Sequence, residues 1–232
     1  MFLDVDGTLL DIAPRPEAVV VTNGLRHDLA AAEQALGGAL ALVSGRPIAE
    51  LDRLFAPLRL RISGVHGAEV RATADAPVQN LAPGSLDEKA WQELTRVLGG
   101  FPGCYAENKK VSFAVHYPEG TDIVALRSAL ERLIAWLGDQ GTPLRLLAGH
   151  RVFEVQLCGF DKGRAISRFM TQPPFAGRTP VFIGDDDIDR AAFDAVLAQG
   201  GLAYSVGPAL PKLTGAFSGP EAVRAWLHGL AQ

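Results

Sequence analysis

The sequence lacks a long hydrophobic run, a cysteine-rich motif and an excess of positive charge. No segment approaches the roughly 18 consecutive apolar residues of a membrane-spanning helix, and no basic-then-apolar leader precedes the first motif. We therefore expect a soluble, cytoplasmic protein. The only cysteines, Cys104 and Cys158, are far apart and lack the spacing of a metal site, which predicts a reduced, buried pair without a role in function.

The charge composition and the missing glycine motifs exclude several classes of function. Lys and Arg total 22 against 26 for Asp and Glu, a net charge of −4, so neither nucleic acid nor an anionic membrane surface is an expected partner. The chain has no G-x-G-x-x-G or Walker-type sequence for nucleotide phosphates. The acidic stretches "DVDG" and "DDDID" lack the glycine and glutamate that an EF-hand calcium loop requires at its sixth and twelfth positions.

Both ends of the chain alternate short apolar runs with helical patterns. The first part predicts strands at "FLDV", "LALVS" and "LRISGVH", with helices over 25–36 and 48–55. The last part predicts strands at "VFIGD" and "GLAYSV", with helices over 189–197 and 220–230. This alternation is typical of an α/β protein, a doubly wound, mostly parallel Rossmann-like core.

A different pattern interrupts this core. Residues 86–98 read as a helix, followed by two strands around an Asn-Lys turn, an amphipathic helix near 126–137 and a hairpin that turns at Gly149-His150. The sequence therefore predicts an inserted α+β unit of the order αββαββ. We expect the core to comprise residues 1–72 and 159–232, and the inserted domain residues 73–158.

Polar residues gather where strands of the predicted core end. In an open α/β sheet this edge is where ligands bind. Asp4 ends the first strand, and Gly7 allows a sharp turn through which Asp4, Asp6 and Thr8 can converge. Further clusters follow later strands or open a helix: Ser44-Gly45-Arg46, Asp161-Lys162-Gly163, and the stretch from Gly184 to Asp189.

Crowded carboxylates repel one another unless a cation compensates for their charge, and hard oxygen ligands beside a phosphate are the usual setting of Mg²⁺. Asp4, kept ionised, could attack phosphorus, while a protonated Asp6 could donate to the leaving oxygen and later activate water. Each motif alone also fits a structural role: an Asp-Gly turn, a capped helix start beside Lys162, or an acidic helix N-terminus. Four carboxylates within the five residues 185–189 exceed what such a helix start needs.

In this order the four motifs strongly resemble those of the haloacid dehalogenase superfamily of phosphatases. The resemblance implies a nucleophile, Asp4; a general acid and base, Asp6; phosphate contacts from Thr8, Ser44 and Lys162; and Mg²⁺ at Asp4, the Asp6 carbonyl and Asp185, with Asp189 as support. It also implies that the inserted unit is a cap domain, which supplies specificity and closes over the substrate.

Within the superfamily the chain is most similar to trehalose-6-phosphate phosphatases, through "SGRPIAEL", "GVHGAE", "ENKKVSFAVHY", "GDDDIDRAAF" and "PEAVRAWL". The resemblance implies a Mg²⁺-dependent phosphatase that acts through an aspartyl phosphate, and substrate contacts from Gly7, Gly45, Arg46, Glu69, Glu107, Lys109 and Glu154. The chain departs from the family pattern at Ile188, Arg190 and Pro118. We expect a monomer whose partner is a small sugar phosphate.

Other functions remain open at this point. A related capped phosphatase could act on sucrose phosphate or a phosphorylated mannosyl compound. A phospho-receiver domain also combines an acidic cluster with a lysine on a doubly wound sheet, although it has no use for a large insertion. His66 and His116 are weaker candidates for the site, because such histidines are more often structural.

Overall fold

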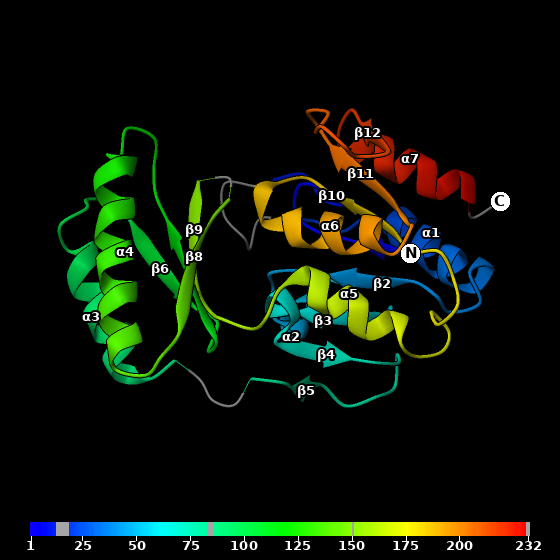
Figure 1. Ribbon diagram of the computed structural model, residues 1–232. Helices are drawn as coiled ribbons and strands as arrows, with labels where there is room; N and C mark the ends of the chain where they lie inside the picture. The colour runs from blue at the N-terminus through cyan, green and yellow to red at the C-terminus, as the bar shows by residue number, and fades with distance from the viewer. Residues whose placement is uncertain (13–18, 83–85, 150, 231–232) are drawn as a thin grey trace. The chain divides into compact units, whose positions relative to one another are not determined.

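The computed structural model describes residues 1–12, 19–82, 86–149 and 151–230. The chain divides into two compact units. Unit 1 combines Met1–Leu81 with Asp161–Gln232, and unit 2 is the intervening Ala82–Phe160. The two segments of unit 1, which run from blue to cyan and from yellow to red in Figure 1, contribute strands to a single sheet.

The sheet of unit 1 has eight strands in the order β12-β11-β10-β1-β2-β3-β4-β5. All neighbouring strands are parallel except the β3/β4 and β4/β5 pairs, which are antiparallel. The strands are β1 (Phe2–Leu3), β2 (Ala41–Val43), β3 (Arg61–Gly64), β4 (Glu69–Arg71), β5 (Gln79–Asn80), β10 (Val181–Gly184), β11 (Leu202–Val206) and β12 (Gly215–Phe217).

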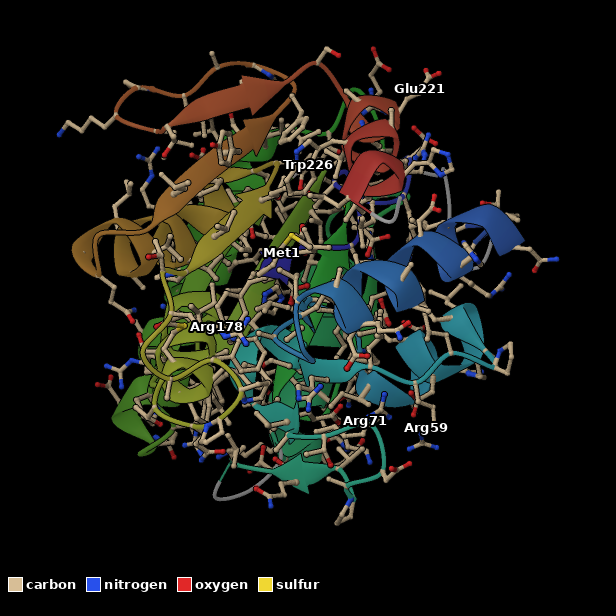
Figure 2. The ribbon with its side chains drawn as sticks, turned by 90° about the vertical axis from the view of Figure 1, so that its right-hand side faces the viewer. Met1, Arg59, Arg71, Arg178, Glu221 and Trp226 are labelled. Carbon is tan, nitrogen blue, oxygen red and sulfur yellow. The ribbon has the colours of Figure 1, made fainter. Side chains whose placement is uncertain are left out.

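Helices cover both faces of this sheet, as Figure 2 shows: α1, α2 and α7 on one side, α5 and α6 on the other. Their bounds are α1 (Asn23–Ala35), α2 (Ile48–Phe55), α5 (Lys162–Met170), α6 (Arg190–Ala198) and α7 (Pro220–Leu230), with short 3₁₀ turns η2 (Val65–Gly67) and η3 (Asp187–Asp189). Strand residues alternate between the two layers: Leu3 packs in the α1/α2/α7 core and Phe2 in the α5/α6 core. Both faces of the central strands are thus buried, as their uninterrupted apolar sequence predicts.

Unit 2 is a four-stranded antiparallel sheet, in the order β6-β7-β9-β8, with two helices on one face. Its elements are α3 (Glu88–Leu98), β6 (Tyr105–Asn108), β7 (Ser112–His116), α4 (Ile123–Asp139), β8 (Leu144–Gly149) and β9 (Val152–Leu157). Phe113, Val115, Phe153 and Val155 form its core with the leucines of α3 and α4. The αββαββ order is the one the sequence predicts, although His150 of the expected hairpin turn lies outside the described residues.

The fold class is as predicted, and two details differ. The units divide after Leu81 and Phe160 rather than after residues 72 and 158, because β5 pairs with β4 and so extends the sheet of unit 1. The prediction of buried cysteines is wrong: both thiols are free, Cys104 is half-buried and Cys158 is exposed. Among the helices of the described residues, none combines the length and apolar character needed to cross a membrane.

Candidate active site

The nucleophile candidate Asp4 and the acidic motif at Asp185 lie side by side because the strands that precede them are parallel neighbours. Leu3 of β1 is level with Ile183 of β10, and the backbone N–H of Asp4 donates to the Ile183 carbonyl at 3.0 Å. Carboxylate oxygens of Asp4, Asp185 and Asp189 all lie within 4.8 Å of one another. The sequence motifs from the two ends of the chain therefore meet at one carboxyl edge of the sheet.

The turn after β1 needs glycine at position 7. Gly7 has φ of 76°, and a Cβ on it would lie 2.0 Å from Oδ2 of Asp185. Thr8, which is fully buried, directs its hydroxyl to Asp185 Oδ1 at 3.4 Å. Gly7 and Thr8 therefore both adjoin the acidic cluster.

Lys162 supplies the positive charge of this cluster. It is the first residue of α5, and its buried Nζ lies 2.7 Å from Asp4 Oδ1 and 2.5 Å from Asp189 Oδ1. The side chain of the preceding residue, Asp161, accepts from Arg164 N and caps the helix. Gly163 allows the backbones of α5 and α6 to approach, since a Cβ there would lie 2.1 Å from the Ala191 carbonyl oxygen.

Asp189 has no solvent exposure, and its hydrogen bonds go to the site itself. One oxygen accepts from Lys162, and the other accepts from the backbone N–H of Asp185 at 2.9 Å and of Asp186 at 3.5 Å. Asp189 therefore fixes both the lysine and the loop that carries Asp185. Its expected role as a support of the metal site stays a prediction.

The electrostatics of the cluster show an excess of negative charge. Burial, together with the charge of Asp189, raises the pKa of Asp4 well above its usual value, despite the attraction of Lys162. The same two causes raise the pKa of Asp185 to about 6 and that of Asp186 to about 7. For Lys162 burial acts to lower the pKa, but Asp189 and Asp4 outweigh it and raise the pKa. Converging hard oxygens with uncompensated charge fit a divalent cation, so the residues suit the expected metal.

Asp6, the expected acid and base, faces Arg46 rather than the lysine. Its two oxygens accept from Nε and Nη2 of Arg46 at 2.7 and 2.8 Å, a bidentate pair. Arg46 Nη1 also lies 3.4 Å from Glu50 Oε2, one helical turn further along. Glu50 was not among the expected site residues, and because Arg46 precedes the N-cap of α2, the helical spacing rule does not indicate this pair.

Ser44 directly follows the strand next to the one that Asp4 follows, as the motif order predicts. Leu3 is level with Leu42, so Ser44 follows β2 at the same edge of the sheet where Asp4 follows β1. The buried Ser44 hydroxyl accepts from the backbone N–H of Arg46 at 3.1 Å.

Glu69 has a structural contact that sequence reasoning missed. Its Oε2 accepts from the backbone N–H of Ile48 at 2.8 Å, at the start of α2, where the N-cap residue Pro47 offers no side-chain hydrogen bond. Asp186, to which no role was assigned, caps η3 through the N–H of Ile188.

Three of the residues expected to contact the substrate, Glu107, Lys109 and Glu154, belong to unit 2. Glu107 of β6 and Glu154 of β9 both lie level with Ala114 of β7, so they share the sheet face opposite the helices. Lys109 Nζ donates to the buried Glu154 at 2.9 Å. His116 and Lys109 lower the pKa of Glu107. The polar face of this sheet therefore holds all three.

Comparison with known proteins identifies the family. The sequence model of trehalose-phosphatase matches residues 2–215. The chain is 38% identical to a probable trehalose-phosphate phosphatase of Sinorhizobium fredii, with 100% of this chain and 87% of the relative covered. It is 36% identical to the trehalose-6-phosphate phosphatase of Escherichia coli, covering 98% of this chain and 84% of the relative.

Solved structures with lower identity share the fold. The C-terminal domain of Candida albicans trehalose-6-phosphate phosphatase has a TM-score of 0.82 at 24% identity, over 99% of this chain and 90% of that one. A phosphatase of the haloalkanoate (HAD) enzyme superfamily from Bacteroides thetaiotaomicron has a TM-score of 0.63 at 16% identity, over 99% of this chain and 93% of that one. With the site geometry and the sequence matches over nearly all of this chain, the conclusion is that the chain belongs to the trehalose-phosphatase family.

Proposed function

We propose that the protein hydrolyses trehalose 6-phosphate to trehalose and phosphate through an aspartyl phosphate on Asp4. The observation that carries the chemistry is the convergence of Asp4, Lys162 and Asp185 from both segments of unit 1. The choice of sugar rests on relatives that are named trehalose-phosphate phosphatases and match nearly the whole chain. As an enzyme of this family the protein is a phosphomonoester hydrolase.

Mg²⁺ is the cofactor we propose, held by Asp4, Asp185 and the backbone carbonyl of Asp6, with Asp189 orienting the loop. When bound, the ion would neutralise charge on the phosphoryl oxygens and on the aspartates. Lys162 places a positive charge 2.7 Å from Asp4 and opposes the rise in the pKa of this carboxyl, and a bound cation would act in the same direction, toward the ionised form that a nucleophile requires. Ser44 and Thr8 are proposed to donate hydroxyl hydrogen bonds to the phosphoryl group.

The reaction then needs two proton transfers. A carboxylate oxygen of Asp4 forms a bond to phosphorus while the bond to the sugar oxygen breaks, and Asp6 gives its proton to that oxygen. In the second half, Asp6 takes a proton from water, which attacks the phosphorus and releases phosphate and Asp4. Both oxygens of Asp6 accept from Arg46 in the structure, and each keeps a second lone pair that can carry the proton to be donated.

Unit 2 is proposed to act as the cap that recognises the sugar. A neutral disaccharide carries no charge but many hydroxyl groups, and charged side chains form the stronger hydrogen bonds to them. Glu107, Lys109 and Glu154 gather such groups on one sheet face. Arg46 and Glu69, expected at the substrate, are engaged with Asp6 and the start of α2, which supports an indirect role for Glu69.

A panel of sugar phosphates tests the proposal. Phosphate release would be measured with Mg²⁺ for trehalose 6-phosphate, sucrose phosphate, a mannosyl phosphate compound and an aryl phosphate. We expect the highest kcat/KM for trehalose 6-phosphate. A preference of tenfold or more for another sugar would overturn the substrate, and a single labelling event without turnover would favour a phospho-receiver. Size-exclusion chromatography with light scattering tests the expected monomer of 24.6 kDa.

A further inference from the structure

The turn between β3 and β4 has a backbone conformation that ordinary side chains avoid. Val65 has φ of 46°, His66 has φ of 52° and Gly67 has φ of 105°. Left-handed conformations are uncommon outside glycine, and for a β-branched residue such as Val65 they are outliers. Such conformations persist only where the surrounding structure imposes them, and they concentrate at functional sites.

Hydrogen bonds join this turn to the Ser44-Gly45-Arg46 loop. The N–H of Val65 donates to the Arg46 carbonyl and the N–H of His66 donates to the Ser44 carbonyl, both at 3.0 Å. In the reverse direction the N–H of Ser44 donates to the Ser63 carbonyl at 2.9 Å. The turn thus presents two consecutive N–H groups to two carbonyls of the loop.

The His66 side chain packs against the same loop. His66 is buried, and its ring lies over the α-carbon of Gly45: a Cβ on Gly45 would lie 2.5 Å from His66 Cε1 and 2.6 Å from Nε2. Gly45 does not have a positive φ, so the ring, rather than the backbone, is what demands glycine here. The ring thus determines how closely the backbone of Gly45, between Ser44 and Arg46, can approach the β3–β4 turn.

The other end of the turn touches the start of α5. A Cβ on Gly67 would lie 2.8 Å from the backbone oxygen of Asp161, the residue before Lys162. One short buried segment therefore contacts both the loop of the Ser44 hydroxyl and the helix start that carries the lysine.

From this geometry we infer that His66 is a positioning residue: through Gly45 it holds Ser44, which contacts the phosphoryl group, and Arg46, which contacts Asp6, in register with Lys162. The histidine itself stays outside the bond-making steps. The inference rests on the proposed phosphatase chemistry of unit 1 and is independent of the sugar. Small misplacements of such groups cost large factors in rate, up to about 10²-fold for roughly 1 Å.

A rescue experiment tests this role in the full-length, Mg²⁺-loaded enzyme. Gly45→Ala should lower kcat for an aryl phosphate by at least about tenfold, because the new Cβ meets the His66 ring and displaces the loop. His66→Ala should lower kcat by several-fold. In the double variant the ring is gone, so adding Gly45→Ala to His66→Ala should cost less than about threefold. His66→Asn, which tolerates the left-handed conformation, serves if His66→Ala does not fold.

Binding of inorganic phosphate, measured by calorimetry, is the second readout. We expect Gly45→Ala to weaken phosphate binding by at least tenfold when His66 is present. When His66 is already replaced, the same substitution should change phosphate binding little. Equal effects of Gly45→Ala in both backgrounds, or unchanged kcat and phosphate binding in a folded His66 variant, would overturn the inference. A wild-type enzyme that cleaves aryl phosphate but not trehalose 6-phosphate would refute the proposed substrate and leave the role of His66 open to the same test. If no ester is cleaved, the calorimetric titration with phosphate still tests the role of His66.

Discussion

Replacing Asp185 by asparagine is expected to stabilise the metal-free protein near neutral pH, although it removes a residue the proposed reaction needs. Asp185 lies among Asp4, Asp186 and Asp189, with Lys162 close to Asp4 and Asp189. Burial and the charge of Asp189 raise its pKa from 3.8 to about 6. Folding therefore forces an ionised carboxylate into an environment that disfavours it.

The dependence on pH follows from this raised pKa. Below about pH 4 both folded and unfolded chains hold the proton, and the carboxyl carries no penalty. Between about pH 4 and 6 the unfolded chain ionises while the folded chain keeps its proton, so the contribution of Asp185 to stability falls as the pH rises and stays low above pH 6. The full difference corresponds to about 3 kcal/mol. Because Asp185 titrates together with its neighbours, neutralising it alone should recover about 1–3 kcal/mol.

Thermal unfolding of chelator-treated protein measures this effect. At pH 7.5 Asp185→Asn should raise Tm by about 2–12 °C, given about 2–4 °C per kcal/mol for a chain of this size. Near pH 4 the wild type and the variant should agree. Mg²⁺ should raise the Tm of the wild type at pH 7.5 more than that of the variant, because the ion binds the folded state.

Asp187→Asn is the matched control. Asp187 lies two residues away, but its side chain is 77% exposed and 3.4 Å from Arg190, so its replacement should leave Tm within about a degree or two. A lower Tm for metal-free Asp185→Asn at pH 7.5, or the same gain at pH 4 as at pH 7.5, would refute the electrostatic reasoning.

Three further predictions concern activity. Asp4→Asn should reduce turnover by several orders of magnitude with an unchanged circular dichroism spectrum, since the nucleophile is lost; near-normal turnover would remove Asp4 from that role. Chelation should abolish phosphate release and Mg²⁺ should restore it, because Asp4, Asp185 and Asp189 form one acidic cluster; activity that survives exhaustive chelation would contradict a metal role. Glu154→Ala should raise KM for trehalose 6-phosphate at least about tenfold and for an aryl phosphate much less; equal losses on the two substrates would place Glu154 outside sugar recognition.

The core and the acidic residues at its edge could be predicted from the sequence, because short-range sequence patterns indicate both. Apolar runs of strand length alternate with helix-period patterns, and parallel strands must end at a common edge. The position of Asp4 beside Asp185 follows from these two facts and the neighbouring places of β1 and β10. The buried ion pairs of Lys162 likewise agree with the motif order.

Other features depend on tertiary contacts that leave little trace in sequence. Glu69 accepts from the first N–H of α2, 21 residues earlier in the chain, and no local sequence pattern predicts such a hydrogen bond. Val65 and His66 adopt left-handed conformations without the glycine or asparagine that would signal them. Strand β5 has only two exposed, polar residues, Gln79–Asn80, and thus no hydrophobic alternation from which the boundary of unit 1 could be placed.

The interrupted layout of unit 1 has a consequence for how the protein is made. Strand β1 is synthesised before the other strands of this sheet, yet one of its two neighbours, β10, begins at Val181. The nascent chain must therefore keep the apolar β1 incompletely paired while the residues from Asp4 to Pro180 are synthesised, and unit 2, continuous from Ala82 to Phe160, can fold meanwhile. The acidic cluster can form only after Asp189 has been synthesised, so a nascent protein cut short before Asp185 would have no means of assembling it.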